Sequence, residues 1–341
     1  MPGEPTIDQV HIDAALTRFA VELFFMSPDR FVASAIAPAI PVDNQGGKYF
    51  VEDPRPVLGD STETEIMYGD VSPELNFKFT KESYGTNLEA LRVILPDGTA
   101  KNADAVMQRK LQGVDKLVNR FAIKRERALA ALITESDSYP GGDTGDHWIT
   151  AASAWSGAGV DPKVDIDSAI DQVEIASGVT PNILLCSPNA YNILTRNDEI
   201  KDLIRYTSPS AEMYLKKGVI GNELFNLNLI KAGAVYNEAA PLETVAMGRI
   251  WGDATTDAGL TWALVCYVDP SPLGGADVWT SGFASQFIWN QNNIAPGMMG
   301  RLGVYRIPER ESTAYDFRTD FESKITNNLA GAMIVGISDA S

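Results

Sequence analysis

The sequence predicts an α+β fold, and three observations lead to that prediction. One long amphipathic helix occupies residues 101–133. Short helices alternate with short apolar strands between residues 165 and 268. From residue 284 onward the pattern contains strands alone. Helices mixed with strands in one part of the chain, followed by a run of strands, are typical of the α+β class.

The helix at 101–133 is the clearest element of the chain. Its apolar residues recur at three- and four-residue steps and form one stripe, which only Arg125 breaks. At 1.5 Å per residue the helix would be about 50 Å long, well above the globular mean. We therefore expect it to lie across a sheet or a neighbouring subunit. The stripe consists of Met107, Leu111, Val114, Val118, Phe121, Ala128 and Leu132.

The first 86 residues bury little surface of their own. Prolines break residues 1–45 repeatedly, so we expect an extended arm with one short helix near 12–25. Strands are predicted at 48–52 and 75–81, with a long acidic stretch between them. That stretch is too long for a hairpin turn, which favours a protruding two-stranded loop. Arm and loop both need another surface to lie on.

The middle and end of the chain supply the remaining elements. Helices are predicted at 165–176, where Gly178 ends the helix, and at 189–204, and a Gly-rich surface loop at 137–160 precedes them. Cys186 and Cys266 each end an apolar run, which favours small core residues over a disulfide or a reactive thiol. The predicted strands are 182–186, 227–230, 235–236, 243–247, 262–268, 284–289, 303–307 and 330–337.

Composition limits the class of protein. The chain has 341 residues, of which 45% are hydrophobic, enough for a real core. Its net charge of -17 disfavours an independent reader of nucleic acid, although a wall that encloses nucleic acid remains compatible. The N-terminus does not have the pattern of a secretory signal, and no apolar run approaches the ~20 residues of a membrane span. We expect a protein made and kept in cytoplasm.

The sequence offers little material for catalysis or for a cofactor. Its only histidines are His11, in the predicted arm, and His147, in the Gly-rich loop, and neither sits in a recognisable catalytic setting. The chain contains no C-x-x-C, H-E-x-x-H, phosphate-loop or G-x-S-x-G motif. We expect no enzyme, no cofactor and no metal site.

Two other groups of residues invite a binding interpretation. Asp161, Asp165, Asp167 and Asp171 have no glycine placed for an EF-hand turn, so capping of a helix N-terminus is favoured over calcium binding. Trp148 and Trp155 are expected to pin the Gly-rich loop to the body rather than to stack on a ligand.

Several stretches together resemble a known family. Residues 155–206 contain a helix, then Gly178-x-x-Pro-Asn, a strand, and a helix with Ser187-x-x-Ala-Tyr-x-x-Leu. Residues 84–91 and the closing strands at 310–324 and 330–336 add to the likeness. In this order the parts resemble the major capsid proteins of tailed bacteriophages, which have the Hong Kong 97 fold. No single motif is diagnostic, and the order of parts is the signal.

The resemblance implies a division of the chain. It implies a long spine helix within a peripheral domain, and an axial domain inserted into that peripheral domain. The expected parts are an N-terminal arm at 1–45, an extended two-stranded loop at 46–86, a peripheral domain at 87–164 with the spine helix at 101–133, an axial domain at 165–278, and return strands of the peripheral domain at 279–341.

The resemblance also implies a function. The chain would be the structural subunit of an icosahedral phage head that self-assembles into pentamers and hexamers around packaged double-stranded DNA. Its partners would be other copies of itself, a separate scaffolding protein, a portal and a decoration protein, and it would reside in the virion after assembly in the host cytoplasm. The alternatives are an encapsulin nanocompartment shell and, in a different class, a soluble hydrolase or ligand-binding protein.

Opposite charges mark two segments that would meet between subunits. Residues 48–74 carry seven acidic residues against two basic ones, whereas residues 101–127 carry eight basic residues against three acidic ones. These fields would guide the loop of one subunit onto the spine or rim of its neighbour, although two solvated faces are the plainer interpretation. The expected subunit interface comprises Tyr49, Phe50, Arg55, Glu63, Glu65, Arg109, Lys116 and Arg120.

Overall fold

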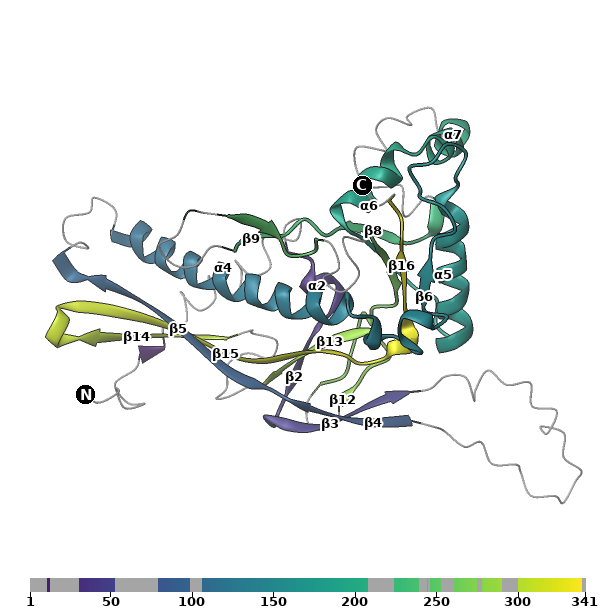
Figure 1. The fold of residues 1–341 in the computed structure, drawn as a ribbon. Coiled ribbons are helices and arrows are strands. Elements are labelled where there is room, and N and C mark those ends of the chain that lie inside the picture. The colour runs from purple at the N-terminus through teal and green to yellow at the C-terminus, as the bar shows by residue number, and fades with distance from the viewer. Residues whose placement is uncertain are drawn as a thin grey trace, which may run out of the picture.

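A long helix lies along one face of a mixed sheet, and a second sheet with its own helices stands at one end of that helix (Figure 1). A third, small sheet lies on the opposite side of the first sheet from the long helix (Figure 1). The computed structural model describes residues 11–12, 31–52, 79–98, 106–207, 224–238, 244, 246–252, 261–274, 278–289 and 300–338.

The helices follow the sequence predictions with one division. The predicted long helix is confirmed from Val106 onward, and residues 101–105 lie outside the described part. The helix predicted at 189–204 is two helices that meet at Asn197. The helices of the described residues are α2 (Ala33–Ile36), α4 (Val106–Ile133), α5 (Pro162–Ser177), α6 (Pro188–Arg196) and α7 (Asp198–Thr207), with 3-10 turns η3 (Ser136–Ser138), η4 (Gly142–Thr144), η5 (Pro308–Arg310) and η6 (Asn328–Ala330).

The first sheet is built around one long strand. Strand β15 pairs with β14 and β13 end to end on one side and with β5 on the other, all antiparallel. Strand β1 extends the sheet beyond β14, and β2 pairs parallel with β13. Its six strands are β1 (His11–Ile12), β2 (Ala39–Val42), β5 (Asn87–Pro96), β13 (Ala284–Trp289), β14 (Arg301–Ile307) and β15 (Ser312–Ile325).

Helix α4 packs its apolar stripe on this sheet. The ring of Phe121 lies 5.2 Å from that of Phe317 on β15. Of the predicted stripe, Val114, Val118 and Phe121 are buried, and the side chains of Met107 and Leu111 lie outside the described part. Ala128 is exposed, because the buried stripe continues through Leu129 and Ile133. The buried apolar positions of the described part of the helix are Val114, Leu117, Val118, Phe121, Ala122, Leu129, Ala130 and Ile133.

The second sheet is buried on both faces. Alternate residues of its central strands contribute to two separate cores, so that Leu185 and Leu264 face the α4 side while Leu184 and Val265 face α5 and α6. Cys186 and Cys266 are free and fully buried here, as expected of core residues. The strand order is β6 (Trp148–Thr150), β16 (Gly331–Val335), β11 (Ala263–Cys266), β7 (Ile183–Cys186) and β8 (Asn228–Lys231).

Two smaller sheets complete the described strands. Strand β3 pairs antiparallel with β4 and parallel with β12, so the predicted base of the extended loop is confirmed as a strand pair. The first predicted strand matches β3. The second, predicted at 75–81, overlaps β4 at residues 79–81 and β4 continues to Gly85, while residues 75–78 lie outside the described part. The strands are β3 (Gly46–Glu52), β4 (Phe79–Gly85) and β12 (Val278–Trp279), and separately β9 (Val235–Asn237) with β10 (Met247–Arg249).

The described part of the predicted arm packs into the body of its own subunit. Phe31, Val32 and Ile36 are buried against α4, and Ile40 is buried where β2 joins the first sheet. Residues 31–42 are therefore part of the core of the subunit, contrary to the expectation that the arm at 1–45 is extended and buries little surface of its own. The short helix expected near 12–25 falls almost wholly outside the described residues, and the domain boundaries stay a prediction.

A buried carboxylate holds this segment in place. Glu126 of α4 is fully buried, and its Oε1 accepts hydrogen bonds from the backbone N–H of Val32 at 2.8 Å and from Trp251 Nε1 at 2.6 Å. Its Oε2 accepts one from the N–H of Ala33 at 3.0 Å. Burial raises the pKa of Glu126, although these donors and Arg125 act in the opposite direction.

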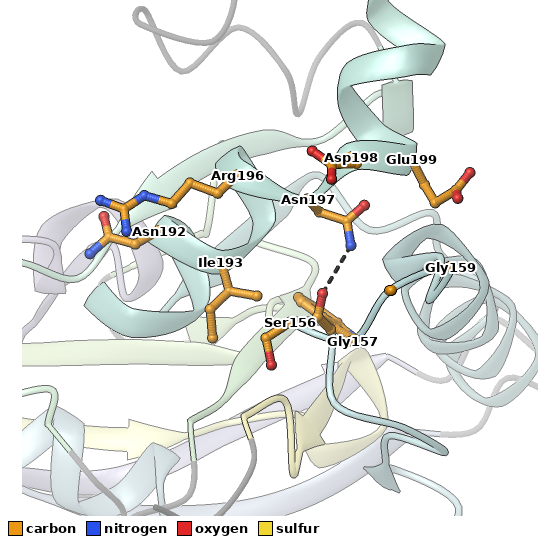
Figure 2. A pocket seen from close by; sticks show the side chains of 11 residues that line it. Ser156, Gly157, Gly159, Asn192, Ile193, Arg196, Asn197, Asp198 and Glu199 are labelled. Atoms are coloured by element: carbon orange, nitrogen blue, oxygen red, sulfur yellow. Dashed lines mark hydrogen bonds between the residues drawn. The ribbon is translucent and has the colours of Figure 1, made fainter.

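A buried amide holds the junction of α6 and α7. The Nδ2 of Asn197 donates to the carbonyl oxygens of Trp155 and Val160, both at 2.9 Å, and its Oδ1 accepts from the N–H of Ile200 at 3.2 Å. Figure 2 shows Asn197 turned toward the glycine-rich loop at 156–159. This amide joins the loop to both helices, which explains why the helix predicted as one unit bends here.

The Glu126→Ala variant should lose about 3 kcal/mol of unfolding free energy, because it leaves three buried N–H donors without an acceptor. Urea unfolding measures the loss. The exposed Glu135, two residues beyond the end of the same helix, is the control, and Glu135→Ala should stay within about 0.5 kcal/mol.

The same site has a pH signature. Glu126 holds its proton to a higher pH in the native chain than in the unfolded chain. The free energy of unfolding that this difference contributes therefore falls as pH rises from 4.5 through the raised pKa of Glu126. Glu126→Gln should remove that slope, and an unchanged slope would contradict the assignment.

The Asn197→Ala variant should lose about 2 kcal/mol of unfolding free energy, since two buried carbonyls and one N–H lose their partner. Chemical denaturation measures it, with Asn192→Ala on the same helix as the matched control. Asn192 accepts only a 3.4 Å bond from Lys231, so equal losses in both variants would refute the role of Asn197.

Candidate functional site

The small sheet places two of the expected interface residues on opposite faces. Tyr49 is fully buried, with its ring 5.2 Å from that of Phe287, and its hydroxyl donates to Glu82 Oε2 at 3.0 Å. Burial and then the Glu82 carboxylate raise the pKa of Tyr49, so the hydroxyl stays protonated. Tyr49 exposes no surface in the subunit, so it would contribute to assembly only indirectly, by holding β3 and with it Phe50 in place.

Phe50 lies on the outer face of the same sheet. Its half-buried ring stacks on Trp279 at 4.9 Å between centroids and meets Phe79 edge-on at 5.8 Å. The Nζ of Lys81 lies 5.3 Å from the centre of the Phe50 ring. Of the predicted pair, Phe50 is the residue that offers an aromatic surface at the base of the extended loop.

The expected basic face on α4 is present in part. Lys116 and Arg120 are exposed one helical turn apart, away from the buried stripe. Lys124 continues the row and binds Glu89 of β5 at 2.6 Å. Arg109 lies in α4 without a described side chain, and Arg55, Glu63 and Glu65 lie outside the described residues.

Other basic residues of α4 serve the subunit itself. The Arg127 guanidinium lies 4.6 Å from the ring centre of Tyr236 on β9. Arg125 is buried within the stripe, and burial lowers its pKa to about 10, so the guanidinium remains charged at neutral pH. The helix therefore divides its basic residues between an exposed row and internal contacts.

Two pockets on the described part of the chain lie beside α6. A pocket of about 380 Å³ lies between the loop at 156–159 and the α6–α7 junction, lined by Arg196, Asp198 and Glu199 (Figure 2). A pocket of about 620 Å³ lies between α4, the start of α6 and the β9–β10 pair. Neither lining includes a histidine or a cysteine to act as base or nucleophile.

His147 has a structural role. It is buried, and its Nδ1 lies 2.8 Å from the carbonyl oxygen of Gly331 on β16. Trp148 beside it is also buried, with its ring 5.5 Å from that of Tyr139. Trp148 also pairs with Met333 of β16 and belongs to the core, so the prediction that Trp148 pins the loop to the body is confirmed.

The aspartates ahead of α5 cap and anchor that helix. Asp161 is the N-cap and accepts from the N–H of Lys163 at 2.9 Å. Asp165 accepts from Trp155 Nε1 at 2.7 Å, and Trp155 is fully buried. The predicted capping is confirmed for Asp161, and Trp155 also pins the loop as predicted.

The described part of the chain contains no cluster of three or more histidine, cysteine, aspartate or glutamate side chains arranged for a metal ion. None of its helices has the length and the apolar character needed to cross a bilayer. Burial raises the pKa of Cys186 and of Cys266 to about 12, which keeps both thiols protonated and unreactive.

Two buried residues that hold distant segments together, Glu126 and Asn197, were missed by sequence reasoning. Glu126 appeared only as one of three acids within a basic segment, and Asn197 only as a position inside a predicted helix. The Asn197-Asp198-Glu199 run is a helix-start pattern and carried a usable signal for the break. Glu126 carried none, because its partners lie 94 and 125 residues away.

Comparison with known proteins points to one group. Residues 87–231 match the family described as phage major capsid protein E. The major capsid protein of Burkholderia phage BcepMu is 22% identical over 253 residues, covering 71% of this chain and 74% of that protein.

Two solved structures share the fold. A phage-related protein from Bordetella bronchiseptica RB50 is 16% identical, with a TM-score of 0.69 over 97% of this chain and 99% of that one. The capsid protein of Ralstonia phage GP4 is 12% identical, with a TM-score of 0.52 over 92% of this chain and 91% of that one. The chain therefore has the α+β capsid fold of the Hong Kong 97 type and is similar to the major capsid proteins of phages.

Proposed function

We propose that the chain is the structural subunit of an icosahedral phage head, in which its copies form pentamers and hexamers around packaged double-stranded DNA. The observation that carries this proposal is the match of residues 87–231 to the phage major capsid protein E family, found within a chain that has the capsid fold. The work of such a subunit is mechanical, and we assign it no enzymatic activity.

Ring formation follows from the kind of interface proposed. A contact between two different patches of the same chain is heterologous, and it closes into a ring when the rotation between copies allows. Small changes of the same contact then give rings of five and of six. The exposed basic row of α4 is one such patch, and the acidic segment 48–74 is the other. They differ in charge, so the contact between them would be heterologous.

An encapsulin shell is the alternative within the same fold. The family match and the curated relative both name phage capsid proteins, and this favours the phage head. The length of the segment between β3 and β4 also favours it, since encapsulins are usually shorter there. We include a separate scaffolding protein, a portal and a decoration protein as partners of the proposed head, and the virion, assembled in the host cytoplasm, as its location.

The proposed interface joins the acidic segment 48–74 of one copy to the basic row of α4 in the next. Of the residues expected at this interface on α4, the structure describes the side chains of Lys116 and Arg120, and both are exposed. Complementary fields of this kind guide approach and register more than they add affinity. Phe50, Arg55, Glu63, Glu65 and Arg109 complete the proposed set, with Tyr49 in support.

The purified full-length chain should form closed particles of uniform size, because the proposed function places the energy of assembly in contacts between copies. Negative-stain electron microscopy and sedimentation velocity measure this directly. A compact monomer at every concentration, combined with specific binding of a small molecule, would instead favour the alternative of a soluble hydrolase or ligand-binding protein.

Charge reversal by Lys116→Glu with Arg120→Glu should lower particle yield and weaken the dependence of assembly on salt, because the attraction to the acidic segment is lost. Sedimentation at several salt concentrations measures both quantities. Lys163→Glu with Lys201→Glu is the matched control, since it changes net charge equally on α5 and α7. Equal effects of both pairs would attribute the loss to net charge and reject the α4 interface.

A further inference from the structure

The outer face of the small sheet carries a closed triangle of aromatic rings. Phe50 of β3 stacks on Trp279 of β12 at 4.9 Å, and Phe79 of β4 meets Phe50 at 5.8 Å and Trp279 at 5.6 Å, both edge-on. The pairing register explains the grouping, because Phe50 lies directly opposite Trp279 on one side and Lys81 on the other.

This face is exposed although it is apolar. Phe79 keeps 47% of its surface in solvent and Leu273, which bridges to Trp279, keeps 64%. The Nζ of Lys81 lies 5.3 Å from the Phe50 ring centre and 6.0 Å from that of Phe79, and Lys48 is exposed on the same face of β3. Among the described residues, no segment covers the three rings.

The opposite face of the same sheet is already in the core. Tyr49 and Val278 are fully buried there, and the ring of Tyr84 stacks on Phe287 at 4.8 Å. An antiparallel pair with one face in water normally alternates apolar residues inward and polar residues outward. Here both faces are aromatic, as in a sheet that is covered on both sides.

The charge of this face indicates what covers it. Lys48 and Lys81 place positive charge beside the rings, whereas the whole chain has a net charge of -17, so another copy of the chain is an attractive partner. Acidic surface with apolar neighbours does occur on the described chain. On α5, exposed Asp171 lies between Val164 and Ile175 on one face of the helix.

We propose that the outer face of the β12–β3–β4 sheet, formed by Phe50, Phe79, Trp279, Lys81 and Leu273, is a docking site for an acidic surface of a second copy of this chain. The inference rests on the proposed function and adds to it a contact separate from the basic row of α4. Aromatic side chains at the centre of an interface commonly carry much of the binding energy. The charge of Lys81 would set the orientation of the acidic surface that docks on them.

The test uses the full-length chain alone, so that only copies of itself are present. Phe79→Ser should raise the concentration at which half of the protein is in particles roughly tenfold or more. The melting temperature of the subunit should change little, since Phe79 belongs to none of the buried clusters. Met247→Ser is the control, because Met247 is 61% exposed on β10, away from this face. Assembly of Phe79→Ser at the wild-type concentration would overturn the inference.

Acylation of Lys81, followed by mass spectrometry, identifies the occupant. Full reaction in isolated subunits and protection in particles is the expected result. Protection already present in the subunit would mean that residues of the same chain cover the rings, and full reaction within particles would mean that nothing does. Either outcome overturns the inference while particle formation still supports the proposed function. A wild-type chain that never forms particles overturns both.

Discussion

A single buried carboxylate joins three distant parts of the chain. Charge taken out of water is costly unless hydrogen bonds replace its hydration, and Glu126 accepts three such bonds inside the core. The donors come from the start of α2, at Val32 and Ala33, and from Trp251 after β10. Because these bonds fix residues 31–36 on α4, the chain continues into β2 in position to pair with β13. The front of the protein thus becomes part of its core.

The second sheet explains which strands can be predicted from sequence. Its central strands are buried on both faces, so they appear as continuous apolar runs such as 183–186 and 263–266, with boundaries predicted to within a few residues. Strand β15 is different, because Asp316, Arg318 and Asp320 alternate with residues that face α4. Resemblance to a family placed strands there, whereas apolar content alone did not reveal a strand of 14 residues.

The surfaces were predictable to the extent that they follow local geometry. Four-residue spacing opposite an apolar stripe placed Lys116 and Arg120 on the exposed side of α4. Strand alternation separates Tyr49 from Phe50, but which of the two faces the core depends on Phe287, more than 200 residues later in the chain. The same applies to Trp279, whose contact with Phe50 arises from a parallel pairing of distant strands. Sequence therefore indicates that a face exists, and tertiary pairing decides what fills it.

A strongly acidic subunit needs such a division of roles to assemble. Copies with a net charge of -17 repel one another at a distance, and the repulsion weakens only where a basic surface faces an acidic one. Exposed basic residues on α4 and on the outer face of the small sheet provide two such surfaces, and the second of these also carries aromatic rings. Charge on the two faces would then select orientation while the rings supply adhesion, since charged pairs in water contribute little net affinity and buried aromatic area contributes much. General repulsion with two local attractions restricts the ways in which copies can meet, and a closed shell requires that restriction more than it requires tight binding.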